Sequence, residues 1–413
     1  MMSKVVNALI LFAAISASAE ATVSDVVVNQ RWPWSEKVDI DFVLSGETND
    51  VEVTARWDAH PEPYRLGTLF AVAPGSRRFT WDPASSPFRG QTLTGFTVTV
   101  SNAAASAHNY IVVDLVDGGY EFMSAPPSGG WTDEHKSSKM VFRRIPAGTY
   151  TLGEPLETFE HLGQSSPDYY ADIQNRRQVT FTSDFYVGIF KYTKAQHICL
   201  GTGAASYDFA PQGELSYNEL RGAKPDVDWP ITMYNVASNS LVAKLRAKAG
   251  SGLVVDLCQE DQWEVAARAD TTTFWPTGGA TTETLPTHTN QVNVFVAWYG
   301  NVGPAQQSVG TMNDNGWGLY DVIGLGGEWT LDATAGTGTI PARNRLPDAY
   351  TDPIGGKNCD RRVLRSASGG SESVTFSELL PCRRQLADPG WQRYSTRFCI
   401  HLKPLGSLTF EGL

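Results

Sequence analysis

The strongest constraint on how this chain can fold is the small number of helices and strands expected after residue 139. Beyond that point glycine, tryptophan and long irregular runs dominate, and only residues 238–249 and 260–269 have a helical pattern. A domain of about 265 residues with so few helices and strands needs buried aromatic side chains, side-chain hydrogen bonds or bound ions. The reason is that buried backbone groups without partners are costly.

The segment before residue 120 has a different pattern. Apolar residues alternate with polar ones in short runs that are separated by Gly, Pro, Asn and Asp, which is typical of strands in a small β-sandwich. We therefore predict a β-sandwich over residues 22–120 and a linker over residues 121–138. The predicted strands are VSDVVVN, KVDIDFVLSG, DVEVTARWDA, SRRFTWDP, GFTVTVSN and YIVVDLVDG.

The first residues resemble a secretory signal peptide. Lys4 precedes an apolar run over residues 5–15, and the small residues Ala17, Ser18 and Ala19 follow it. The run is shorter than the roughly 20 residues that a bilayer requires, and we find no later segment that could span one. We predict that residues 1–21 are a cleaved leader and that the mature protein is extracytoplasmic, whether secreted, periplasmic or on the cell surface.

Charge and cysteine content restrict the partners. The net charge is −11, and the basic residues are scattered rather than gathered into a stripe, so we expect no nucleic acid partner. Five cysteines allow at most two disulfides in an oxidising compartment, and none forms a CxxC pair. The sequence does not show which of them pair: Cys199, Cys258, Cys359, Cys382 and Cys399.

The stretch WGLYDVIGLGGEW, residues 317–329, invites comparison with a dinucleotide-binding turn. Gly324 and Gly326 suit the first two glycines of that fingerprint, but its third glycine position holds Trp329. The residues that follow, TLDATAGTGTIP, cannot form the helix that the fingerprint needs. We therefore reject a dinucleotide site.

The same stretch suits a calcium site better. Calcium takes six to eight oxygen ligands from carboxylates and backbone carbonyls. Asp321 and Glu328 supply carboxylates, while Gly324 and Gly326 can turn their carbonyls inward because glycine tolerates positive φ. The alternative is that Asp321 caps a turn and Glu328 accepts backbone hydrogen bonds without any metal. The spacing alone favours neither.

A series of segments over residues 140–402 resembles the formylglycine-generating enzyme, or sulfatase-modifying factor, family. The segments occur in the order that the family has. They are FRRIPAGTYTLGE, VTFTSDFYVGIFKYTKAQH, WPITMYNVA, DLCQEDQWEVAARA, FWPTGG, SVGTMNDNGWGLYDVIGLGGEWTLD and RRVLRSAS. The resemblance implies an α+β, loop-rich, modified C-type-lectin-like domain over residues 139–405, preceded here by a small all-β, immunoglobulin-like sandwich. It also implies that Asp321, Gly324, Gly326 and Glu328 bind calcium.

The catalytic positions of that family are not retained. Its enzymes use two cysteines, five residues apart, to hold copper and the substrate cysteine while oxygen converts that cysteine to formylglycine. Thiolates suit copper(I), but the corresponding positions here are Ser371 and Phe376. We therefore expect no copper site and identify no catalytic residue.

Three functions remain open. The first is a non-oxidase that binds a protein, a glycan or a small ligand on the calcium-stabilised scaffold. The second is an oxidoreductase that matures sulfatases with a divergent site. The third is a diversified ligand-binding surface protein, which the unusual composition of residues 366–395 permits. We expect the tryptophans at 263, 275, 298, 317 and 329 to lie in the core. For His197 and His401 we expect the ordinary role of a surface or core side chain.

Overall fold

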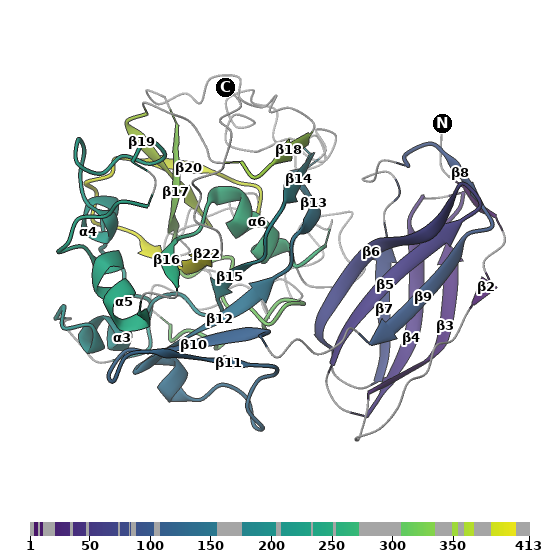
Figure 1. The fold of residues 1–413 in the computed structure, drawn as a ribbon, viewed down its shortest axis with the longest axis horizontal. Coiled ribbons are helices and arrows are strands. Elements are labelled where there is room, and N and C mark those ends of the chain that lie inside the picture. Colours follow the sequence, from purple (N-terminus) through teal and green to yellow (C-terminus); the bar gives the residue numbers. More distant parts are fainter. Residues whose placement is uncertain are drawn as a thin grey trace. The chain divides into compact units, whose positions relative to one another are not determined.

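The chain folds into two compact units, Met1–Ser106 and Ala107–Leu413, shown in Figure 1. The structure is a computed structural model. It describes residues 4–6, 9–10, 21–33, 36–46, 49–72, 75–81, 83, 88–102, 108–154, 176–203, 208–232, 234–250, 253–271, 307–334, 349–353, 359–366 and 381–401. Among these residues no helix is long and apolar enough to cross a bilayer.

The described part of the first unit contains only strands and turns. Its sheets have the orders β3-β4-β7, β2-β9-β5-β6 and β1-β8. The strands are β1 (Lys4–Val6), β2 (Leu9–Ile10), β3 (Thr22–Gln30), β4 (Val38–Ser45), β5 (Asn49–Trp57), β6 (His60–Val72), β7 (Gly75–Trp81), β8 (Thr92–Thr94) and β9 (Thr97–Asn102). The runs from VSDVVVN to GFTVTVSN form β3, β4, β5, β7 and β9, as predicted.

One hydrophobic core lies between the two larger sheets of this unit. Val38, Ile40 and Phe42 of β4 and Val51 and Val53 of β5 are buried in the same cluster, because alternate residues of a strand point to one face. The strand β6 escaped prediction because it contains Pro61 and Pro63. It lies at the edge of its sheet, where prolines interrupt no ladder on the open side.

The second unit combines short strands with short helices. Its strands are β10 (Tyr110–Asp114), β11 (Tyr120–Met123), β12 (Lys139–Ile145), β13 (Gly148–Leu152), β14 (Arg177–Phe181), β15 (Phe185–Gly188), β16 (Val254–Leu257), β17 (Glu328–Thr334), β18 (Ala349–Thr351), β19 (Arg361–Arg365), β20 (Gln385–Ala387), β21 (Ser395–Thr396) and β22 (Phe398–His401). Its helices are η2 (Asp133–Lys136), α3 (Lys194–Cys199), α4 (Tyr217–Arg221), α5 (Leu241–Ala249) and α6 (Glu260–Arg268).

The described residues of this unit form three sheets, with the orders β11-β10-β12-β15-β22-β16, β13-β14-β18 and β20-β19-β17-β21. The first joins strands from both ends of the unit, because the C-terminal β22 pairs with β15 and β16. Helix α6 contacts β13, β17 and β19, while α5 contacts β10 and β16 (Figure 1). The helices and sheets thus enclose a core to which sequence-distant segments contribute.

The boundary between the units lies earlier than we predicted. The sequence predicts a sandwich over residues 22–120 and a linker over residues 121–138, but β10 and β11 belong to the six-stranded sheet of the second unit. Tyr110–Asp114 pairs with β12 on one side and with β11 on the other. The alternation of YIVVD is that of any strand, and it carries no information about which sheet the strand joins.

The two predicted helices are confirmed as α5 and α6. Ser240 caps α5 by accepting a hydrogen bond from the N–H of Ala243 at 3.2 Å. Helix α6 lacks a Ser or Thr cap, and the carboxylate of Asp332 takes that role by accepting from the N–H of Glu260 at 2.5 Å. Of the five tryptophans expected in the core, those at 275 and 298 lie outside the described residues, and the buried ones are Trp263, Trp317 and Trp329.

The revised boundary predicts how truncated chains behave. A fragment that begins at residue 107 should fold, whereas one that begins at residue 119 lacks β10, so that β12 pairs only with β15 and β11 loses its partner. It also loses Ile111 and Val113 from the core, and each buried aliphatic side chain contributes about 1.5–3 kcal/mol. We expect the shorter fragment to aggregate or to melt at least about 10 °C lower. Equal melting temperatures in thermal unfolding by circular dichroism would contradict the boundary.

Candidate functional site

The segment from Asp321 to Glu328, here called the 321–328 loop, leads from a buried turn into strand β17. Asp321, Gly324, Leu325 and Gly326 have φ values of 52°, 83°, 52° and 96°, so the chain turns sharply through left-handed conformations. Glycine at two of these positions removes the steric cost that a side chain would add. The loop therefore has the tight curvature that the sequence predicted.

Glu328 is the centre of the site and has no exposed surface. Its Oε2 accepts a hydrogen bond from the indole N–H of Trp263 at 2.9 Å and lies 3.4 Å from Nε of Arg397. Its Oε1 lies 2.9 Å from Nζ of Lys191, which is an ion pair without the alignment of a hydrogen bond. Three segments that are distant in sequence therefore meet at one carboxylate.

Lys191 contacts the backbone of the loop as well. Its Nζ donates to the carbonyl oxygen of Gly326 at 2.6 Å, and its side chain is fully buried. Burial lowers the pKa of Lys191, and Glu328 opposes that shift. Burial alone raises the pKa of Glu328, but the cations of Lys191 and Arg397 outweigh it and hold that pKa below its ordinary value. The lysine is thus held between a carboxylate and a carbonyl.

The other predicted ligands already have protein partners on most of their atoms. The Oδ2 of Asp321 accepts from the N–H of Gly310 at 2.6 Å, whereas Oδ1 is buried and has no hydrogen bond among the described residues. Burial raises the pKa of Asp321. The carbonyl of Gly324 accepts from the hydroxyl of Ser366 at 3.2 Å. Asp321 therefore ties the loop to Gly310.

The arrangement of these oxygen atoms does not fit a calcium ion. Calcium needs six to eight oxygen ligands. Of the four carboxylate oxygens of Asp321 and Glu328, only Asp321 Oδ1 and Glu328 Oε1 have no hydrogen bond among the described residues. The carbonyl of Gly326 is already bonded to Lys191. No group of three or more His, Cys, Asp or Glu residues in the described part of the chain is arranged to hold a metal. The calcium prediction finds no support in this geometry.

The positions of the family's cysteine pair, Ser371 and Phe376, lie outside the described residues. Cys382, the cysteine nearest to them in sequence, is fully buried, and burial raises the pKa of its thiol well above the ordinary value. All five cysteines of the chain lie in described segments, and none is in a disulfide. Cys382 is therefore a neutral core thiol.

A second pair of thiols lies together, but in the core. Cys258 directly follows β16 and Cys399 lies on the neighbouring β22, next to the register pair Leu257 and Phe398, and both are fully buried. Burial raises the pKa of Cys399 well above its ordinary value, and a hydrogen bond with Cys258 adds to that shift. These thiols have no exposed surface with which to capture a substrate.

A network of buried ion pairs surrounds helix α6. Glu264 accepts from Arg268 Nε at 2.8 Å and from Arg365 Nη1 at 3.2 Å, and it also receives the N–H of Gly153 at 2.7 Å. Burial alone raises the pKa of Glu264, but the neighbouring arginines lower it to about 2. The network continues through Glu260, which pairs with Arg365 and with Arg384. These charges hold α6 against β19 and the residues around 384.

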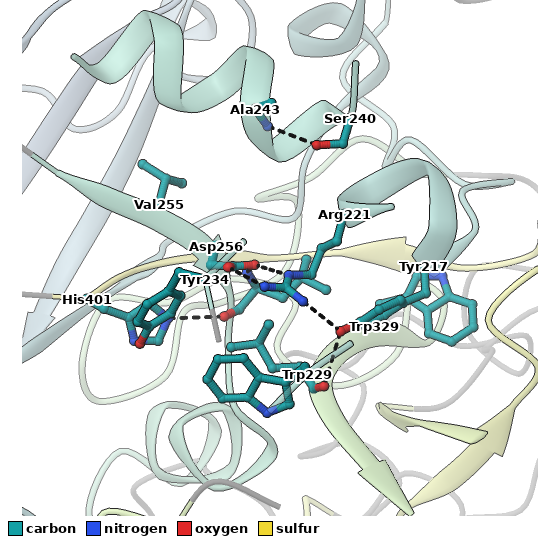
Figure 2. Close-up of polar contacts among 12 residues, drawn as sticks. Tyr217, Arg221, Trp229, Tyr234, Ser240, Ala243, Val255, Asp256, Trp329 and His401 are labelled. Atoms are coloured by element: carbon teal, nitrogen blue, oxygen red, sulfur yellow. Dashed lines mark hydrogen bonds and ion pairs between the residues drawn. The ribbon is translucent and has the colours of Figure 1, made fainter. Parts of the chain in front are cut away.

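A second polar cluster in the core is drawn in Figure 2. Nε and Nη2 of Arg221 donate to the two carboxylate oxygens of Asp256 at 2.8 and 3.0 Å, and Nη1 donates to the hydroxyl of Tyr217 at 3.1 Å. Arg246 donates to Asp256 Oδ2 at 2.9 Å. The side chains of Tyr234 and His401 lie beside the pair. The cluster joins α4, α5 and β16 and offers no exposed reactive group, so we interpret it as structural.

Lys191 is the important residue that sequence reasoning missed. The signal was available: the lysine stands inside FYVGIFKYT, a run that is otherwise apolar or aromatic. A buried lysine needs a carboxylate partner, and long range pairing cannot be read from one sequence. His401, for which we expected an ordinary surface or core role, lies in the core with 6% of its surface exposed.

Comparison with known proteins places the chain in context. The family model described as "Sulfatase-modifying factor enzyme 1-like domain" matches residues 131–392. No curated protein sequence matches the chain.

The fold of this chain is similar to those of several solved structures, among them the following three. Treponema denticola variable protein 1 is 17% identical, with a TM-score of 0.44, and the match covers 63% of this chain and 95% of that one. PvdO from Pseudomonas aeruginosa is 16% identical, with a TM-score of 0.42, over 63% of this chain and 94% of its own. CarF is 14% identical, with a TM-score of 0.30, over 62% of this chain and 98% of its own.

The buried histidine predicts a pH dependence of stability. Burial lowers the pKa of His401 to about 4 from its ordinary value of 6.5, so between these values the unfolded chain binds a proton that the folded chain does not. The stabilisation is present above pH 6.5 and is lost as the pH falls toward 4, by about 3 kcal/mol in total. In urea titrations, His401→Gln should flatten the profile between these values. The exposed His108→Gln control should keep the wild-type slope, and equal slopes in all three proteins would contradict the assignment.

Proposed function

This chain belongs to the sulfatase-modifying factor family, and on that premise we propose that it is a non-oxidase member that binds a ligand. The observation that carries the proposal is the chemistry of the cysteine positions. The family's oxidation requires two thiols that reach the substrate, whereas this chain has Ser371 and Phe376 at those places. A hydroxyl is a poor ligand for copper(I), and a phenyl group is none.

The cysteines elsewhere support the same conclusion. Cys258, Cys359, Cys382 and Cys399 are buried, and Cys199 is half-buried and has no cysteine beside it in the sequence. Reactive thiols are partly exposed and have a lowered pKa, whereas burial raises the pKa of Cys382 and of Cys399. No described pair combines exposure with a reactive thiolate.

The scaffold that we propose is a modified C-type-lectin-like domain, with an immunoglobulin-like sandwich before it. Support comes from the strand-rich second unit with its short helices, and from the first unit, in which two sheets share a core. The leader-like residues 1–21 support export to an extracytoplasmic location. In the full chain, Lys4–Val6 and Leu9–Ile10 pair with β8 and β9, and these pairings would be absent after cleavage.

One surface of the second unit suits a ligand. Trp391 is 47% exposed, and the guanidinium carbons of Arg361 and Arg393 each lie 5.9 Å from the centre of its ring. An exposed ring flanked by two cations can stack on a sugar and attract an anionic group. Trp391 and Arg393 also lie within residues 366–395, the segment whose unusual composition the sequence already indicated.

The oxidase alternative is tested by direct assay. Purified protein is given copper, oxygen, a reductant and a peptide with the motif Cys-x-Pro-x-Arg, and the product is examined by mass spectrometry. We expect no aldehyde, because no thiol pair is available to hold the metal and the substrate cysteine. A Ser371→Cys, Phe376→Cys variant serves as the matched comparison. Turnover by the wild-type protein would overturn the non-oxidase proposal.

The ligand surface makes a separate prediction. On an array of acidic and neutral glycans, the wild-type protein should retain acidic members, and Trp391→Ala should weaken that binding by about 3- to 10-fold, since an exposed aromatic ring contributes roughly 0.5–1.5 kcal/mol through stacking and cation–π contacts. Trp32→Ala removes a tryptophan of the first unit that is 38% exposed and is the control. Equal losses in both variants, or no retention of any glycan by the wild type, would contradict this surface as the binding site.

A further inference from the structure

The backbone around Lys191 is fixed on both sides. The N–H of Ile189 donates to the carbonyl of Val141 at 2.9 Å, and the N–H of Tyr192 donates to the carbonyl of Thr396 at 3.0 Å. Between these anchors the side chain of Lys191 points into the 321–328 loop, where it contacts Gly326 and Glu328. A lysine held in this way has no room to exchange its partners for solvent without moving a strand connection.

The charges of the site balance without a metal. Asp321 and Glu328 contribute two negative charges, and Lys191 and Arg397 contribute two positive ones; all four side chains are buried. Arg397 is itself held in place, since it donates to the carbonyls of Gly188 at 2.6 Å and Tyr320 at 2.7 Å. A calcium ion added to this set would leave two uncompensated positive charges in a buried site, which is strongly unfavourable.

The contacts of the lysine are those that a bound cation would make. A loop built to hold calcium presents a carboxylate and inward-facing carbonyls. Here Nζ of Lys191 lies 2.9 Å from the carboxylate of Glu328 and 2.6 Å from the carbonyl of Gly326, which are two of the four predicted ligands. An ammonium group is a donor only, so both contacts suit it.

We propose that the ammonium of Lys191 is a resident cation that replaces calcium in the 321–328 loop, so that the loop folds without any metal. Because the ammonium belongs to the chain itself, its hydrogen bond and ion pair tie Gly326 and Glu328 to the segment between β15 and α3, a link that a soluble ion could not provide. The stability of the loop therefore does not depend on the supply of calcium around the protein. This inference holds whether or not the protein has an enzymatic activity.

The test uses terbium(III), a luminescent substitute for calcium. The indole of Trp263 lies 2.9 Å from Glu328, so terbium bound in the loop would be excited through that tryptophan. We expect no sensitised emission from the full-length wild-type protein, and no change in its melting temperature between calcium and EDTA. Both measurements use the unaltered chain and so do not depend on whether a variant folds.

The central variant is Lys191→Met, which keeps the length of the side chain and removes its charge. In EDTA it should melt about 5–10 °C below the wild type, because Glu328 loses a buried partner. It should also gain terbium emission that calcium competes away, and calcium should restore part of the lost melting temperature. Lys194→Met is the matched control: its ion pair with Asp208 is 3.3 Å long and partly exposed, so we expect a small loss and no response to calcium.

Three results would overturn the proposal. The first is wild-type terbium emission that calcium displaces and that Asp321→Asn abolishes. The second is a Lys191→Met protein as stable in EDTA as the Lys194→Met control. The third is a folded Lys191→Met protein that gains no terbium emission, because a position from which a cation has been removed should then accept another.

Discussion

A carboxylate with no exposed surface must be matched by positive charge from elsewhere in the chain, and Glu328 sets that requirement for this protein. Lys191 follows β15, Trp263 lies on α6 and Arg397 precedes β22, and all three side chains converge on Glu328. Glu328 also begins β17, which pairs with β19 and β21. Removing one partner of such a buried pair typically costs about 3–5 kcal/mol, so the arrangement of these segments depends on one carboxylate.

Buried ion pairs between segments that are distant in sequence recur at two further places in the described part of the second unit. Glu264 joins α6 to the segment at Gly153 and to Arg365 of β19. Asp256 joins β16 to α4 and α5 through Arg221 and Arg246. Each cluster replaces the backbone pairing that longer helices and strands would supply. Because their partners are far apart in sequence, these pairs form only when the whole unit is assembled.

The sequence predicted local features well and distant ones poorly. Five strands of the first unit (β3, β4, β5, β7 and β9), the helices α5 and α6, and the curvature of the 321–328 loop follow from period, capping and glycine placement, which are local properties. The membership of β10 in the second unit was not predictable, because alternation does not identify a partner strand. The role of Lys191 was not predictable either, since its partner Glu328 lies 137 residues away. The one available signal was that Lys191 stands inside the apolar and aromatic run FYVGIFKYT.

A fold held by internal charges can lose its catalytic thiols and its metal without losing its shape, which is consistent with a family member that binds rather than oxidises. The most direct measurement is a high-resolution crystal structure of the protein grown in millimolar calcium. We predict density for the Lys191 side chain that ends beside the carbonyl of Gly326 and the carboxylate of Glu328. A coordinated ion at roughly 2.3–2.6 Å from those oxygens, with Lys191 turned away, would contradict the account.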